Sequence, residues 1–315
     1  MIEHSEQKPG GFNDLRASGK GSGSFCRLAS RLFLSLLVLA AFVPFVAAAE
    51  QKPFGQDGID RNDPNFVKAS LLIASPIETL YSCVGHAALR MECPKFNLDY
   101  CFTYEGEQAQ DKFWEFFAGK LKMGMFAVPT TNYLSVCAQA GRGVMQYRLN
   151  LPPDAKQRLW KDMDDRVAEG ANLPYDYLRR GCAQVLFSTI KRAVEPAYRV
   201  QVVQWPERFS KWTRREFVDG SVQDFPWTKF CLYTMVGTEC DRTVSKPQKV
   251  VIPADLLEIL RLARINGVPV IDDEGAQLLP VVHVPKNCVI TPMVIASGFV
   301  VLSVEALANP PGRCA

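Results

Sequence analysis

The chain has 315 residues, with 36 Lys and Arg against 33 Asp and Glu and a formal net charge of +3. This near balance, without basic runs, argues against a nucleic-acid-binding protein. The length suits one large domain, or one domain with an appendage.

The first 49 residues predict an export signal. Residues 1–31 are polar and basic, residues 32–46 carry no charge, and Ala47-Ala48-Ala49 follows. This order is typical of a signal peptide cut after Ala49; the alternative is an uncleaved N-terminal membrane anchor. We therefore expect an exported protein, periplasmic or secreted, in an oxidising compartment. Residues 50–66 are polar, with Gly and Pro, and are expected to form an exposed leader into the domain.

Short strands are predicted next. Residues 70–74 form a first strand ended by Ser75-Pro76, residues 84–91 a second, and residues 98–104 its hairpin partner. The alternation in the second strand places Ala87, Leu89 and Met91 on one face and His86, Ala88 and Arg90 on the other. A later strand is expected at 144–149.

Four helices are predicted from apolar residues at helical spacing. They cover about 111–121, 153–170, 182–194 and 253–263. In residues 196–250 the apolar residues show no clear spacing of a helix or a strand. The tail, residues 271–315, is predicted to be a small β-rich extension. Its last run, 289–304, lacks charge but is short for a membrane span, and we expect a buried strand or helix there.

Cysteine usage indicates one free thiol. Ten cysteines occur, and Cys26 lies in the predicted signal peptide, so nine, an odd number, remain after export. If Cys182 is free, the others suffice for four disulfides. Plausible pairs are Cys93/Cys101, Cys231/Cys240 and Cys288/Cys314, although spacing alone does not fix connectivity.

Cys182 and His86 are the candidate catalytic pair. Gly181 precedes the thiol and an apolar helical run follows it, so the positive end of the helix dipole favours the thiolate. A thiolate and an imidazole together equip a site for covalent acyl transfer. The competing interpretations are a disulfide-bonded cysteine and a structural histidine. His283, in an apolar alternating run, is the other histidine of the exported chain and an alternative base.

Such a pair also needs a group that orients the imidazole. The predicted hairpin offers Thr103 or Tyr104, and Asp99 is the acidic option. No cofactor is required. With no C-x-x-C pair and few histidines, no metal site is expected either.

The chain resembles the N-terminal periplasmic domain of Lnb-type bacterial lipoprotein N-acyltransferases, over roughly residues 68–270. The similar segments are Ala74-Ser75-Pro76, Val84-Gly85-His86-Ala87-Ala88-Leu89-Arg90, Tyr175-x-Tyr177 with Cys182, Gly237-Thr238-Glu239-Cys240-Asp241-Arg242 and Val251-Ile252-Pro253-Ala254-Asp255-Leu256. The family usually has Asn where Gly181 stands and Arg shortly after the cysteine, where this chain has Gln184 and Val185.

The resemblance implies that Cys182 is a nucleophile, His86 its base, and Arg90 a residue that binds an anionic substrate group or holds the strand. Tyr175 and Tyr177 are further candidates for substrate binding. The fold expected is α+β: a circularly permuted papain-like domain over 67–270, because the histidine strand precedes the cysteine helix.

The implied partners are an acyl donor and an amine acceptor, including a lipid or lipoprotein, at the membrane surface. Two alternatives stay open: a cell-wall peptidase or amidase with the same dyad, acting on cell-wall peptides, and a non-catalytic envelope binding protein.

Overall fold

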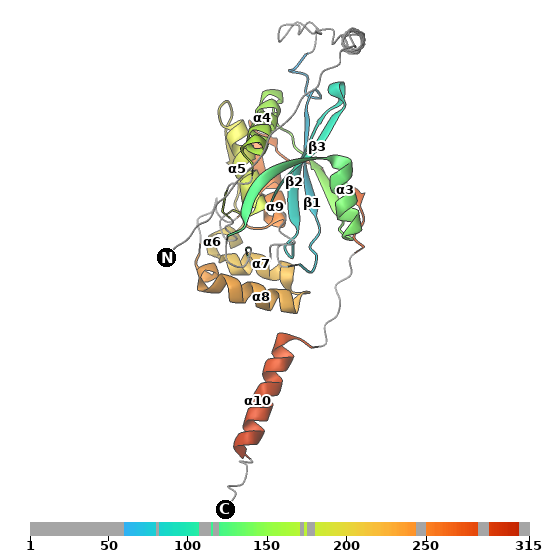
Figure 1. Cartoon of the computed structure of the whole chain (residues 1–315). Coiled ribbons are helices and arrows are strands. Elements are labelled where there is room, and N and C mark those ends of the chain that lie inside the picture. The colour runs from blue at the N-terminus through green and yellow to red at the C-terminus, as the bar shows by residue number, and fades with distance from the viewer. Residues whose placement is uncertain are drawn as a thin grey trace, which may run out of the picture. The chain divides into compact units, whose positions relative to one another are not determined.

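The computed structural model describes residues 60–79, 82–106, 115, 120–170, 173–174, 180–243, 250–282 and 290–308. This part of the chain is α+β, as predicted, with an antiparallel sheet and packed helices (Figure 1). Some predictions fall outside the described residues. They concern the leader up to residue 59, most of the helix at 111–121, and the residues Tyr175, Tyr177 and His283.

The main sheet has the strand order β10-β5-β1-β2-β3-β4-β6 within the described residues, and every neighbouring pair is antiparallel. Its strands are β1 (Lys68–Ala74), β2 (His86–Cys93), β3 (Leu98–Gly106), β4 (Lys122–Pro129), β5 (Val144–Arg148), β6 (Leu173–Pro174) and β10 (Ala276–Leu279). A smaller antiparallel sheet consists of β7 (Val200–Val202), β8 (Ala263–Ile265) and β9 (Val268–Pro269).

Strand alternation sorts the central side chains between two apolar layers, which confirms the predicted faces of β2. Ala87, Leu89 and Met91 are fully buried in the larger core, whereas Ala88 belongs to a second cluster on the other face. Leu89 lies opposite Leu71 of β1 and Phe102 of β3. Burial on both faces fixes the register, because a slip of one residue exchanges the two faces.

Helices α4 (Pro153–Glu169), α5 (Cys182–Val194) and α9 (Pro253–Leu262) contribute many of the side chains of the larger core. Each lies where the sequence predicts a helix. In Figure 1, α4 and α5 lie on one side of the sheet and α3 (Thr130–Gln139) on the other. Strand β4 and α3 were not predicted, since Gly124 and Pro129 interrupt the apolar pattern of that segment.

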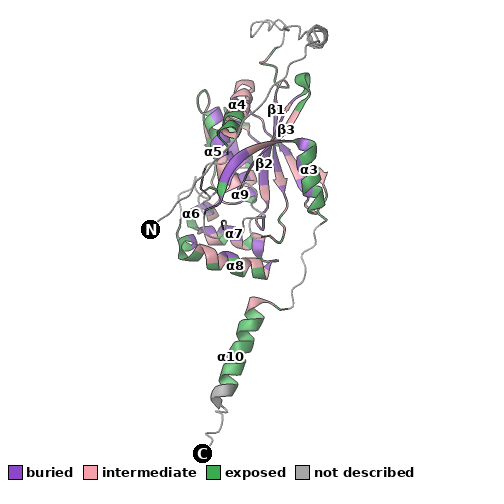
Figure 2. Ribbon diagram, in the orientation of Figure 1, coloured by how far each residue is buried: buried purple, intermediate pink, exposed green. Residues whose placement is uncertain are grey.

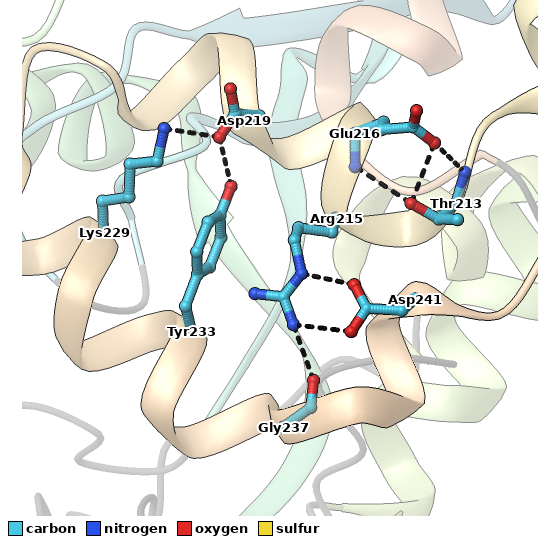
Figure 3. A network of polar contacts seen from close by, with 8 residues as sticks. All are labelled: Thr213, Arg215, Glu216, Asp219, Lys229, Tyr233, Gly237 and Asp241. Atoms are coloured by element: carbon cyan, nitrogen blue, oxygen red, sulfur yellow. Dashed lines mark hydrogen bonds and ion pairs between the residues drawn. The ribbon is translucent and has the colours of Figure 1, made fainter.

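The segment without clear periodicity forms short helices joined by polar contacts (Figure 3). They are α6 (Arg208–Lys211), α7 (Arg214–Val222), α8 (Pro226–Val236) and the 3₁₀ helix η2 (Gly237–Asp241). Arg215 of α7 binds the Asp241 carboxylate and the Gly237 carbonyl, and Asp219 accepts bonds from Lys229 and Tyr233. These contacts tie α7 to α8 and η2.

The described cysteines are all free, so the pairs Cys93/Cys101 and Cys231/Cys240 were predicted wrongly. Cys93 lies opposite Leu98 and Cys101 opposite Arg90 in the β2–β3 ladder. Their separation along the ladder places the two thiols on opposite faces of the sheet. Cys231 is exposed on α8, whereas Cys240 is buried. Cys288 and Cys314 lie outside the described residues.

The C-terminal extension is only partly β. Strand β10 pairs with β5 at the sheet edge, but α10 (Pro292–Ala308) is a helix, and its residues 293–305 are exposed (Figure 2). A helix was one of the two forms expected for the uncharged run at 289–304, but the expected burial was wrong for residues 293–305. A helix satisfies its backbone hydrogen bonds within itself and needs no partner strand. Among the described residues, no helix combines the length and apolarity needed to cross a membrane.

Candidate active site

Cys182 is the first residue of α5, and its thiol lies beside the start of β2. Gly181 caps the helix in an extended conformation, with φ −69° and ψ 163°. The backbone N–H groups of Ala87 and Ala183 donate hydrogen bonds to the thiol sulfur. The free backbone donors and the dipole of a helix N-terminus favour negative charge at this position.

His86 is the first residue of β2 and lies opposite Ala74 of β1. The preceding Gly85 has a φ of +85°, and a Cβ at this position would lie 2.9 Å from the Ala74 carbonyl oxygen. A side chain at residue 85 would therefore be strained by both the backbone conformation and the contact. Glycine is what allows the chain to turn into β2 at this point and present His86.

The thiol and the imidazole are hydrogen-bonded to each other, and each changes the ionisation of the other. Burial raises the pKa of Cys182. The charge on His86, the bond to it and the two backbone N–H groups outweigh burial, so the thiol pKa is lowered. Burial lowers the pKa of His86, but the charge and hydrogen bond of Cys182, with the charge of Glu105, raise it overall. Both directions favour a thiolate–imidazolium pair.

Thr103, one of the three candidate orienting residues, is in contact with His86. Its Oγ1 lies 2.6 Å from His86 Nε2 and donates to Glu105 Oε1 at 2.7 Å. Glu105 Oε1 also lies 3.4 Å from His86 Nε2. Sequence reasoning missed Glu105, because the predicted strand ended at residue 104 whereas β3 continues to Gly106.

The other two candidates contact other groups. Tyr104 belongs to the larger core, and its hydroxyl has no hydrogen-bond partner among the described residues. Asp99 accepts from Arg90 and from the Thr130 hydroxyl, and these bonds lower the pKa of its carboxyl even though burial opposes this. The structure thus brings Thr103, but neither Tyr104 nor Asp99, to the Cys182–His86 pair.

Arg90 is held within the sheet. Its guanidinium binds Asp99 through two nitrogens at 2.8 and 2.7 Å, reaches Gln146 Oε1 at 2.8 Å and lies 3.2 Å from Glu92. These contacts link β2 to β3 and to β5. Its donors are thus engaged by protein acceptors, which is the arrangement expected of a residue that holds the strands.

Arg142 is a second charged neighbour that sequence reasoning missed. Its Nε donates to the Ser75 carbonyl oxygen at 3.0 Å, one residue beyond the Ala74–His86 pair of the β1–β2 ladder. Its charge opposes protonation of His86, contrary to the effect of Glu105. In the described part of the chain, no His, Cys, Asp and Glu side chains group in threes or more to form a metal site.

The comparisons with known proteins place this site within a family. The sequence model of the Lnb N-terminal periplasmic domain matches residues 56–215, slightly more than half of the chain, and includes both His86 and Cys182. No curated protein and no solved structure matches the chain. The chain therefore belongs to the family of the Lnb N-terminal periplasmic domain, and so to the exported, periplasmic proteins of the cell envelope.

Proposed function

We propose that this protein is a thiol enzyme that transfers acyl groups in the cell envelope. The observation that carries the proposal is the hydrogen-bonded Cys182–His86 pair at the N-terminus of α5, with the thiol pKa lowered and the imidazole pKa raised. Perturbed ionisation of two adjacent groups in this sense is what a nucleophile and its base require.

In the first half-reaction, His86 takes the thiol proton and the Cys182 sulfur attacks the donor carbonyl. The carbonyl oxygen becomes an oxyanion, and the Cys182 backbone N–H at the helix start is available to stabilise it. The intermediate collapses with release of the donor's leaving group, which receives the proton from His86. The product is an acyl thioester on Cys182.

In the second half-reaction, an amine acceptor attacks the thioester carbonyl. His86 accepts the proton of the amine and returns it to the sulfur as the new amide is released, so the enzyme is regenerated without a cofactor. Water in place of the amine gives hydrolysis. A cell-wall peptidase or amidase is therefore the alternative function, because it uses the same dyad.

The proposed fold is a circularly permuted papain-like domain. Its support is chain order: the histidine opens β2, and the cysteine opens α5 later in the chain. We also propose a lipid or lipoprotein donor and a reaction at the membrane surface; membership in the family of the Lnb N-terminal periplasmic domain supports this proposal.

Product analysis separates these activities. The purified protein is incubated with acylated lipids, an acylated lipopeptide and cell-wall peptide fragments, each with and without an amine acceptor. We expect a new amide from an acylated donor, and its loss in both Cys182→Ala and His86→Gln. Cleaved cell-wall peptides with no amide product would favour the hydrolase. Products unchanged in both variants would show that the Cys182–His86 pair is not catalytic, and the absence of product from every donor would favour a non-catalytic binding protein.

A further inference from the structure

The environment of His86 Nε2 is built from the β2–β3 ladder. Ala88 lies opposite Thr103 in this ladder, so its continuation brings residue 105 opposite His86. The Glu105 carboxylate and the Thr103 hydroxyl consequently lie on the face of the sheet that carries the imidazole. The distances are 2.6 Å from Nε2 to Thr103 Oγ1 and 3.4 Å from Nε2 to Glu105 Oε1.

Proton counting fixes the direction of these bonds. Thr103 has one hydroxyl proton and donates it to Glu105 Oε1 at 2.7 Å. Its oxygen can then act only as an acceptor toward His86, so Nε2 must carry a proton. In a neutral imidazole, the proton on Nε2 leaves Nδ1 as the unprotonated nitrogen. With Nε2 engaged, Nδ1 is the nitrogen available to the Cys182 thiol.

We infer that Glu105 is a positioning residue, which acts through the Thr103 hydroxyl to hold His86 in the tautomer with Nδ1 free to accept the thiol proton. This inference rests on the proposed function and adds a residue to it. When His86 becomes an imidazolium, the Glu105 carboxylate also stabilises the new charge. Arg142 has the opposite effect on His86, because its positive charge disfavours the imidazolium.

The position of Glu105 suits this role. Its side chain is 50% exposed, whereas that of His86 is 14% exposed. A partly solvated carboxylate carries its charge at little cost in desolvation, yet it reaches the ring through one intervening hydroxyl and also lies 3.4 Å from Nε2 directly. Asp99, the nearest acid on the same strand face, is bound to Arg90 and Thr130 instead.

The test measures the rate of alkylation of Cys182 by iodoacetamide against pH, by mass spectrometry of the Cys182 peptide in the full chain. Glu105→Gln keeps an acceptor for the Thr103 hydroxyl but removes the charge. We expect its rate at pH 7 to fall roughly tenfold, the change that one pKa unit gives. Glu105→Asp should recover much of the rate. Glu78→Gln, at an exposed position, is the matched control and should leave the rate unchanged.

Two further measurements separate positioning from general stability. In the Thr103→Val background, Glu105→Gln should cause a smaller loss than in the wild type, because the path through the hydroxyl is broken and only the direct charge interaction with the imidazole at 3.4 Å remains. The chain has three histidines, so ¹⁵N-histidine labelling gives few signals, and those of His86 are identified by their loss in His86→Gln. In spectra recorded above the pKa of His86, where the imidazole is neutral, we expect a protonated Nε2 in the wild type and a mixture of tautomers in Thr103→Val.

The outcomes distinguish this inference from the proposed function. A wild-type Cys182 that reacts no faster than the exposed Cys231 overturns both. A reactive wild-type Cys182 whose pH profile Glu105→Gln leaves unchanged overturns the role of Glu105 alone. Additive losses from Thr103→Val and Glu105→Gln also overturn it, because they show that the carboxylate does not act through the hydroxyl.

Discussion

Individual residues differ in how far local sequence reveals them. Cys182 and His86 could be found from their neighbours, since a glycine before an apolar helix and a glycine before an alternating strand are local signals. Glu105 could not be found in this way, because its relation to His86 depends on the register and length of the hairpin. Arg142 lies far from both in sequence and reaches the site only through the packing of the Gly141–Gly143 turn against Ser75.

Asp255 is a buried acid whose ionisation should affect stability. Burial raises the pKa of its carboxyl to about 7, against the opposing effects of the Ile252 backbone N–H and the charge of Arg208. A carboxyl with a raised folded-state pKa stabilises the fold below its unfolded pKa, near 4. This contribution is lost as pH rises through about 7.

We therefore predict that Asp255→Asn weakens the pH dependence of stability. The difference in unfolding free energy between wild type and variant should change between pH 5 and pH 8, in favour of the variant at pH 8. Asparagine can still accept the Ile252 N–H bond, so the helix cap is retained. Urea unfolding at both pH values measures this difference. An equal difference in unfolding free energy between wild type and variant at the two pH values would contradict the raised pKa of Asp255.

Secondary-structure elements were predictable where the spacing of the apolar residues, the residues at the ends of the element and the burial of its apolar face all agree. Helices α4, α5 and α9 have apolar residues at helical spacing, and a proline lies at the start of α4 and α9. For residues 289–304 the sequence left strand and helix open, because a short apolar run fits a buried strand as well as a helix. The disulfide prediction failed for a different reason: sequence spacing does not say that Cys93 and Cys101 face opposite sides of a sheet.

The contact of α5 with the sheet should dominate stability. Leu186 is fully buried on α5, in the core that also contains Leu89 and Met91. We predict that Leu186→Ala lowers the free energy of unfolding by about 2–5 kcal/mol. Val136→Ala on the exposed side of α3, at 63% exposure, is the control and should change it by less than about 0.5 kcal/mol. Equal effects of the two substitutions would contradict the packing described.

At the scale of the whole molecule, residues beyond the segment that the family model matches also border the site. The family match ends at residue 215, yet α9 lies beyond it and still packs against α5 in the larger core. The Val251 carbonyl, just before α9, would lie 3.6 Å from a Cβ at residue 181, so this segment borders the residue before the thiol. The exposed apolar helix α10 makes no comparable contribution to the core, within the residues described.

The most direct test of the central claim is detection of the acyl-enzyme. The protein is treated briefly with an activated acyl ester, digested under acidic conditions and analysed by mass spectrometry. The account predicts an acyl group on Cys182 that hydroxylamine removes, absent in Cys182→Ala and formed far more slowly in His86→Gln. An acyl group found mainly on another residue, or present equally in Cys182→Ala, would contradict the account.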